Sequence, residues 1–208
     1  RVLVRSSLVE RGKGQSYRPG RELYRLASLL RAKFDLSQVA RPLLEQLWSR
    51  WQETTVLCVY NPATRCAAVA EVLLTRHTLR LAIEPGRDIA LPWGSLGRAM
   101  LAQLGEEDLD AVLATSTTGP LSGRPLPRRS ALRTELEQIR ANGVAVYFDP
   151  AYEMAGVAAP LSGAGGLLFG CVGIIMPTRR FDKQDAPAIS KAVRAVAREL
   201  SGIIALNC

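Results

Sequence analysis

The hydrophobic pattern of this chain switches between the period of a helix and that of a strand. Apolar side chains recur every three or four positions over residues 19–33 and 36–51, which predicts two amphipathic helices, the second capped by Asp35. A last helix begins at Asp182 or Asp185, and its apolar stripe is Ile189, Val193, Val196, Leu200 and Ile203. Capping and dipole signals predict three further helices: one begins near Gly94–Ser95, one begins at about Glu106, and one is capped by Ser130.

The strand-like stretches are grouped in the middle and near the end of the chain. They are Thr54–Tyr60, Cys66–Leu74, Thr78–Ile83 and Val144–Asp149, with two short ones around Leu8–Glu10 and Ser16–Arg18. Strands and helices do not alternate strictly, so a parallel βαβ arrangement is disfavoured. The pattern therefore predicts an α+β fold with an antiparallel sheet.

The longest uncharged run, residues 154–178, is long enough to raise the question of a membrane helix, which needs about 20 apolar residues. Six glycines, Pro160 and Pro177 argue against a helix, because Gly and Pro are the poorest helix formers. We expect two buried strands, Gly156–Leu161 and Leu167–Met176, joined by a glycine-rich turn. No membrane span is predicted.

The second of these strands has two glycines in its interior, Gly170 and Gly173. A glycine inside a strand marks the close approach of either another backbone or a ligand, and the strand alone leaves both open. With a period of two, Phe169, Cys171, Gly173 and Ile175 share one face.

The net charge of +8 lies mostly at the start of the chain, where the first 35 residues hold nine basic and three acidic side chains. Such a segment can face an anionic polymer or can simply be solvated. The four cysteines have no C-x-x-C spacing and are expected to be reduced thiols in a cytoplasmic protein, although a Cys58–Cys66 bridge stays open. The first 31 residues contain no apolar core of a signal peptide.

Four stretches in order resemble the IclR-type transcriptional regulators. They are Leu8–Arg11 with Tyr17–Leu26; Asp35–Leu47; Leu96–Ala102, where the family usually has L-G-K-A-L-L-A; and Glu135–Ala145 followed by Ala158–Pro160 and Pro177–Arg180. Together they cover nearly the whole chain. The resemblance implies a GAF-like antiparallel sheet between helices, with a pocket for a small effector. It also implies a homodimer or tetramer that binds operator DNA through the full-length protein.

The resemblance divides the chain into a remnant of the DNA-binding winged helix (residues 1–18), a linker helix (19–33) and an effector-binding domain (34–208). The helix-turn-helix of the family precedes the wing, so we expect the recognition helix to lie outside this sequence. Any DNA contact of the chain itself would come from Arg11 and Lys13 at the wing tip, as phosphate contacts.

The resemblance also assigns a pocket, with a helix start whose N–H groups suit a carboxylate. The expected effector-binding residues are Trp93, Gly94, Ser95, Leu96, Tyr147, Asp149, Met154, Gly156, Phe169, Cys171, Gly173 and Ile175. Gly173 and Ile175 stand where the family usually carries two pocket serines. An apolar or aromatic organic acid is therefore favoured over a two- or three-carbon keto acid.

Catalysis is not expected. His77 is the only histidine, so no Ser-His-Asp or Cys-His set can form, and Cys171 lies in an apolar strand. Glu106-Glu107-Asp108 indicates a helix start and not a metal cluster, and no cofactor motif is present. Two functions stay open: a ligand-sensing domain of a transcriptional regulator, and an oligomerisation module whose pocket is filled by its own side chains.

Overall fold

The computed structural model describes residues 1–12, 14, 16–33, 35–116, 118–119 and 123–207, and it forms two compact units, Arg1–Val39 and Ala40–Cys208. The first unit contains α1 (Val2–Arg5), the antiparallel pair β1 (Val9–Arg11) and β2 (Tyr17–Pro19), and α2 (Arg21–Lys33). The two predicted short strands are thus present. The helix begins at Arg21 rather than Pro19, because Pro19 still belongs to β2.

The second unit is built on one antiparallel sheet of six strands in the order β5-β4-β3-β8-β7-β6. Its strands are β3 (Thr54–Asn61), β4 (Cys66–Leu73), β5 (Asp88–Ile89), β6 (Ala145–Asp149), β7 (Met154–Ser162) and β8 (Leu168–Pro177). The predicted α+β class with an antiparallel sheet is confirmed.

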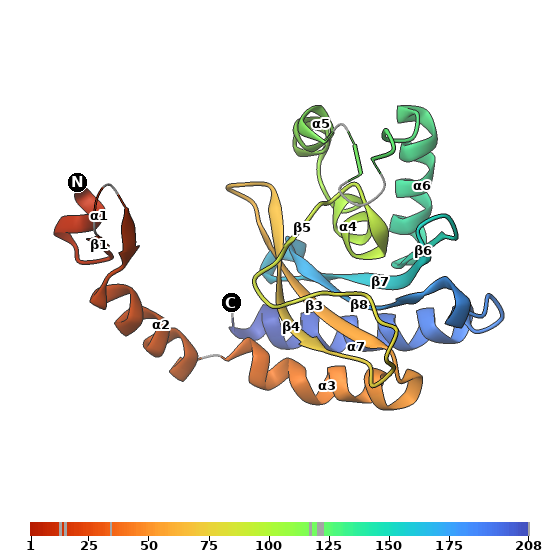
Figure 1. Ribbon diagram of the computed structural model, residues 1–208, viewed down its shortest axis with the longest axis horizontal. Helices are drawn as coiled ribbons and strands as arrows, with labels where there is room; N and C mark the ends of the chain where they lie inside the picture. Colours follow the sequence, from red (N-terminus) through yellow and green to blue (C-terminus); the bar gives the residue numbers. More distant parts are fainter. Residues whose placement is uncertain (13, 15, 34, 117, 120–122, 208) are drawn as a thin grey trace. The chain divides into compact units, whose positions relative to one another are not determined.

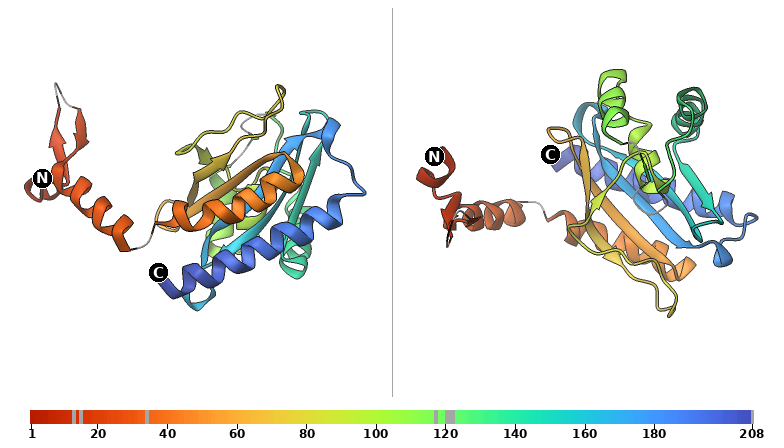
Figure 2. Two further views of the ribbon diagram at one scale, coloured as in Figure 1. Left: turned by 90° about the horizontal axis from the view of Figure 1, so that it is seen from below. Right: turned by 45° about the horizontal axis from the view of Figure 1, so that its top comes forward.

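Helices cover both faces of this sheet (Figures 1 and 2). One face carries α3 (Leu36–Trp51) and α7 (Ala186–Asn207), and the other carries α4 (Gly94–Leu101) with α5 (Glu106–Thr115) and α6 (Arg129–Asn142) beside it. Short 3₁₀ turns, η1 (Ala164–Gly166) and η2 (Thr178–Arg180), border β8. The apolar stripes predicted for the helices supply the buried sides of these layers.

The helix ends follow local chemistry. The carboxylate of Asp35 accepts a hydrogen bond from the N–H of Gln38 at 3.2 Å, as predicted for a cap of α3. Gly143 ends α6 with a φ of 65°, a conformation that glycine adopts without steric cost. Two details were wrong: the N-cap of α6 is Arg128 and not Ser130, and the buried residue at the end of the α7 stripe is Ile204 and not Ile203.

The uncharged run forms the hairpin of β7 and β8, and its turn contains Gly165 and Gly166 with φ values of 66° and 76°. Among the described residues, no helix combines the length and the apolar character needed to cross a bilayer. Within β8, a Cβ on Gly173 would lie 2.7 Å from the carbonyl oxygen of Val157 and 2.8 Å from the Cβ of Ala158. Gly173 therefore serves the close approach of β7 and β8.

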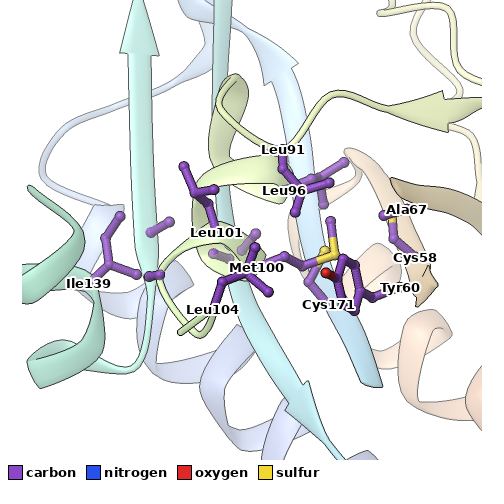
Figure 3. Close-up of a cluster of buried hydrophobic side chains, with 14 of the residues drawn as sticks. Cys58, Tyr60, Ala67, Leu91, Leu96, Met100, Leu101, Leu104, Ile139 and Cys171 are labelled. Atoms are coloured by element: carbon purple, nitrogen blue, oxygen red, sulfur yellow. The ribbon is translucent and has the colours of Figure 1, made fainter. Parts of the chain in front are cut away.

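The core on the α4 side gathers around Met100 and Cys171 (Figure 3). Cys58 lies directly opposite Cys171 in the β3–β8 ladder, and both side chains are fully buried. Burial raises the pKa of the Cys171 thiol well above its usual value. Cys66 is exposed and free, so the alternative of a Cys58–Cys66 bridge is wrong.

Candidate functional site

A cavity of about 470 Å³ opens on the α4 side of the sheet, a size typical of small-molecule sites. Its walls come from segments that are far apart in the sequence. They are residues 80–83, 87–90 and 93–96, together with Tyr147, Tyr152, Met154, Ala155 and Ile175. Most of these side chains are apolar or aromatic, and the charged ones are Arg80, Arg87 and Asp88.

The first turn of α4 forms one wall of the cavity. Gly94 has a φ of 68°, which lets the chain turn sharply from the extended Trp93 into the helix. Trp93 is the N-cap residue, but its side chain makes no hydrogen bond to the described N–H groups of the helix. The first N–H groups of α4 are thus left for water or for a ligand.

Ser95 lies against the sheet beside Gly156. It is only 3% exposed, and it lines the cavity. A Cβ on Gly156 would lie 2.5 Å from the Oγ of Ser95 and 2.9 Å from the carbonyl oxygen of Ile174. The missing side chain at Gly156 therefore allows α4 to sit this close to β7.

The loop before α4 is held by two residues of that helix. A Cβ on Gly97 would lie 2.5 Å from the carbonyl oxygens of Ala90 and Leu91, so only glycine lets the loop pack this closely. The buried Arg98 donates to the carbonyl oxygen of Pro92 and to the carboxylate of Glu135. These contacts hold in place the loop that leads into α4 and carries Trp93.

The outer wall, residues 80–83, is not the strand that the sequence predicts over Thr78–Ile83. The edge of β4 that such a strand would need is already bonded to residues 86–89. For example, the N–H of Val69 donates to the carbonyl oxygen of Arg87 at 2.9 Å. The preceding segment therefore stands away from the sheet. Arg180 donates to the carbonyl oxygen of Leu79 at 3.0 Å and anchors it there.

Two tyrosines form the wall contributed by β6 and the β6–β7 turn. The hydroxyl of Tyr147 donates to the carboxylate of Asp149 at 3.3 Å, and burial together with that carboxylate raises the pKa of Tyr147. The guanidinium of Arg124 lies 4.9 Å from the ring centre of Tyr152 and 3.7 Å from Asp149. Asp149 thus positions the tyrosine wall, and it is not itself a lining residue.

The structure brings most of the predicted effector-binding residues together. The cavity is lined by Trp93, Gly94, Ser95, Leu96, Tyr147, Met154 and Ile175. Gly156 and Asp149 contact two of these residues, as described above.

The predicted pocket floor needs correction at three positions, because the lining does not include Phe169, Cys171 and Gly173. Gly173 packs against Ala158, and Cys171 is enclosed in the core below α4. The ladder pairs Leu161 with Gly170 and Ser162 with Leu168, so Phe169 is an extra residue without a partner on β7. This bulge breaks the alternation on which the prediction relied.

The sequence interpretation missed residues 80–83 and 87–90, Tyr152 and Ala155. The alternating pattern of residues 78–83 is indistinguishable from that of a strand. The turn at Pro85-Gly86 was the available signal, since Gly86 has a φ of 81° and its N–H donates to the carbonyl oxygen of Val69 at 2.7 Å.

Among the described residues, no three His, Cys, Asp or Glu side chains are grouped so that they could hold a metal ion. In the basic N-terminal unit, Arg11 is exposed at the end of β1, whereas Lys13 lies outside the described residues. Glu10 and Arg18 pair across β1 and β2 at 3.1 Å.

The chain is similar to known bacterial transcriptional regulators. A family model described as the bacterial transcriptional regulator IclR C-terminal matches residues 30–202. The chain is 32% identical over 189 residues to the HTH-type transcriptional regulator BhcR of Paracoccus denitrificans, covering 90% of this chain and 67% of that protein. It is 29% identical over 185 residues to the HTH-type transcriptional regulator Rv1719 of Mycobacterium tuberculosis, covering 86% of this chain and 67% of that protein.

Solved structures share the fold. A protein described as an IclR transcriptional regulator from a Silicibacter species superposes with a TM-score of 0.82 at 25% identity, over 98% of this chain and 80% of that one. The Thermotoga maritima IclR superposes with a TM-score of 0.74 at 23% identity, over 98% and 82%. The curated relatives are transcriptional regulators and not enzymes. The chain belongs to the IclR family of bacterial transcriptional regulators, and residues 30–202 match the C-terminal domain of that family.

Proposed function

We propose that this chain is the ligand-sensing part of its regulator, and that the cavity beside α4 binds a small organic effector that alters operator binding. The observation that carries the proposal is an open cavity of about 470 Å³ at the start of a helix. A domain that served only for oligomerisation, with a pocket filled by its own side chains, would not need this space. The cavity thus favours sensing over the oligomerisation module.

The walls favour an apolar or aromatic acid. Trp93, Tyr147, Met154 and Ile175 offer an indole, a phenol, a thioether and a branched aliphatic surface. Burial of each CH₂ group of a ligand against such walls contributes roughly 0.8 kcal/mol. The carboxylate of the ligand would be met by the first N–H groups of α4, where the helix dipole favours a negative charge.

Operator binding belongs to the whole regulator, in which we expect the wing to add phosphate contacts through Arg11 and Lys13. Alone, this chain should bind duplex DNA weakly, with no preference between an operator and a scrambled sequence. The affinity should also fall steeply as salt is raised. Retention of one duplex over scrambled competitors at physiological salt would contradict this expectation.

Calorimetry with a panel of aromatic and medium-chain carboxylates tests the proposed site. We expect binding of at least one of them, and we expect Ile175→Trp to abolish it by filling the cavity. Leu206→Trp adds the same indole at an exposed position of α7 and should leave binding unchanged. If Ile175→Trp lowers stability, Ala82→Trp provides a second test from an exposed position of the opposite wall. Unchanged binding in folded variants of both kinds would place the ligand elsewhere.

A further inference from the structure

We infer that the effector carries two negative charges on an apolar or aromatic body. The N–H groups at the start of α4 bind one of these charges, and Arg80 and Arg87 bind the other. This inference rests on the proposed function, because it concerns the ligand of the same cavity. Both arginines line that cavity, and neither was part of the site predicted from the sequence.

The first argument comes from the partners of the arginines in this unit. Most of them have an ion-pair, hydrogen-bond or ring partner among the described residues, for example Arg98 with Glu135, Arg140 with the carbonyl oxygen of Ala102 and Arg76 with Trp48. Arg80 and Arg87 make no side-chain hydrogen bond, ion pair or ring contact with another described residue. Two guanidiniums without a partner among the described residues thus line a mostly apolar cavity. A guanidinium presents a planar set of donors that matches a carboxylate or a phosphate.

The second argument is that the protein fixes the backbone beside each of these arginines. Next to Arg80, the carbonyl oxygen of Leu79 accepts a hydrogen bond from Arg180 at 3.0 Å. The carbonyl oxygen of Arg87 accepts from the N–H of Val69 at 2.9 Å. The backbone that carries these two exposed arginines is therefore fixed, which lowers the entropy cost of binding an anion there.

The third argument is the charge balance of the cavity. Its lining contains two arginines and one acid, Asp88, and the start of α4 adds a partial positive charge. A ligand with one carboxylate at α4 would leave one of the two guanidinium charges uncompensated, because Asp88 offsets only the other. Asp88 opposes the second charge, so its removal should strengthen the binding of a dianion.

The test is calorimetry on this chain at one ionic strength and a pH of about 8, where a phosphate monoester is doubly charged. The probes are benzoate, terephthalate and phenyl phosphate, which share an aromatic ring and differ in charge. We expect terephthalate, phenyl phosphate or both to bind about tenfold more tightly than benzoate, which corresponds to about 1.4 kcal/mol. The probe with the advantage shows whether the second charge belongs to a second carboxylate or to a phosphate.

Variants assign the effect to the arginines. Arg80→Gln/Arg87→Gln should remove the advantage of the dianion, and Asp88→Asn should increase it. The matched control is Arg128→Gln/Arg198→Gln, which removes the same charge from two arginines outside the cavity that likewise lack a partner among the described residues. The control should keep the advantage.

The outcomes separate this inference from the proposed function. If benzoate binds, if Ile175→Trp blocks it, and if no dianion has an advantage, the inference is wrong and the proposed function stands. The inference is also wrong if the control variant loses the advantage of the dianion as strongly as Arg80→Gln/Arg87→Gln does. The advantage would then come from the overall charge of the protein. If none of the three probes binds in the cavity, the inference is wrong, and the proposed function depends on the wider panel of carboxylates.

Discussion

Replacing Gly173 with alanine tests whether this glycine serves strand packing or ligand access. The added Cβ would lie 2.7 Å from the carbonyl oxygen of Val157 and 2.8 Å from the Cβ of Ala158, whereas ordinary contact begins at 3.4 Å. The neighbouring atoms would have to move by roughly 0.7 Å, and they belong to β7, which is bonded on both sides by β6 and β8. The strand has little freedom to move.

The expected cost is that of overpacking a core, about 1–3 kcal/mol of unfolding free energy. For a chain of this size, about 2 kcal/mol lowers the melting temperature by about 4–8 °C. Thermal denaturation followed by circular dichroism measures this change, and urea denaturation checks it at one temperature.

Gly202→Ala is the matched control, because a Cβ there meets no atom within 4 Å and the residue lies inside α7. Alanine is the better helix former, so this variant should gain about 0.5–1 kcal/mol. If Gly173→Ala proves as stable as Gly202→Ala, the conclusion that Gly173 serves the close approach of β7 and β8 is wrong. Ligand access would then be the remaining explanation for this glycine.

Three further predictions concern pairing, assembly and thiol chemistry. Glu53→Gln should lower the unfolding free energy by about 3 kcal/mol in urea denaturation, because the guanidinium of Arg180 then lacks its buried carboxylate; a change below 1 kcal/mol would contradict this. The chain should self-associate at tens of micromolar through apolar faces such as the exposed leucines of α2, and light scattering that shows only a 22.6 kDa monomer would count against it. A thiol reagent should modify exposed Cys66 in the native protein and spare Cys58 and Cys171, and equal rates in peptide mapping would refute that burial.

The sequence predicted the elements whose signals are local. The cap at Asp35, the stop at Gly143 and the hairpin of β7 and β8 each depend on a few neighbouring residues, so one sequence suffices to find them. The first turn of α4 was also predicted, partly through the family resemblance around residues 96–102. These local signals account for the part of the cavity wall contributed by Trp93–Leu96.

The errors arose where the outcome depends on distant residues. Residues 78–83 have the alternation of a strand, but the edge of β4 that they would need is bonded to residues 86–89. The bulge at Phe169 similarly depends on the register between β7 and β8, which no local pattern records. Both errors affected the site, because both moved residues into or out of the cavity wall.

The outer wall of the cavity is tied by hydrogen bonds to the end of α3. The indole N–H of Trp48 donates to the carbonyl oxygen of Leu74 at 2.9 Å, and the hydroxyl of Thr75 donates to the carbonyl oxygen of Gln52 at 2.5 Å. Arg180 then joins Glu53, two residues beyond α3, to Leu79, the residue that precedes the wall segment 80–83. A ligand that displaces this wall must therefore either break these bonds or move the end of α3 with it.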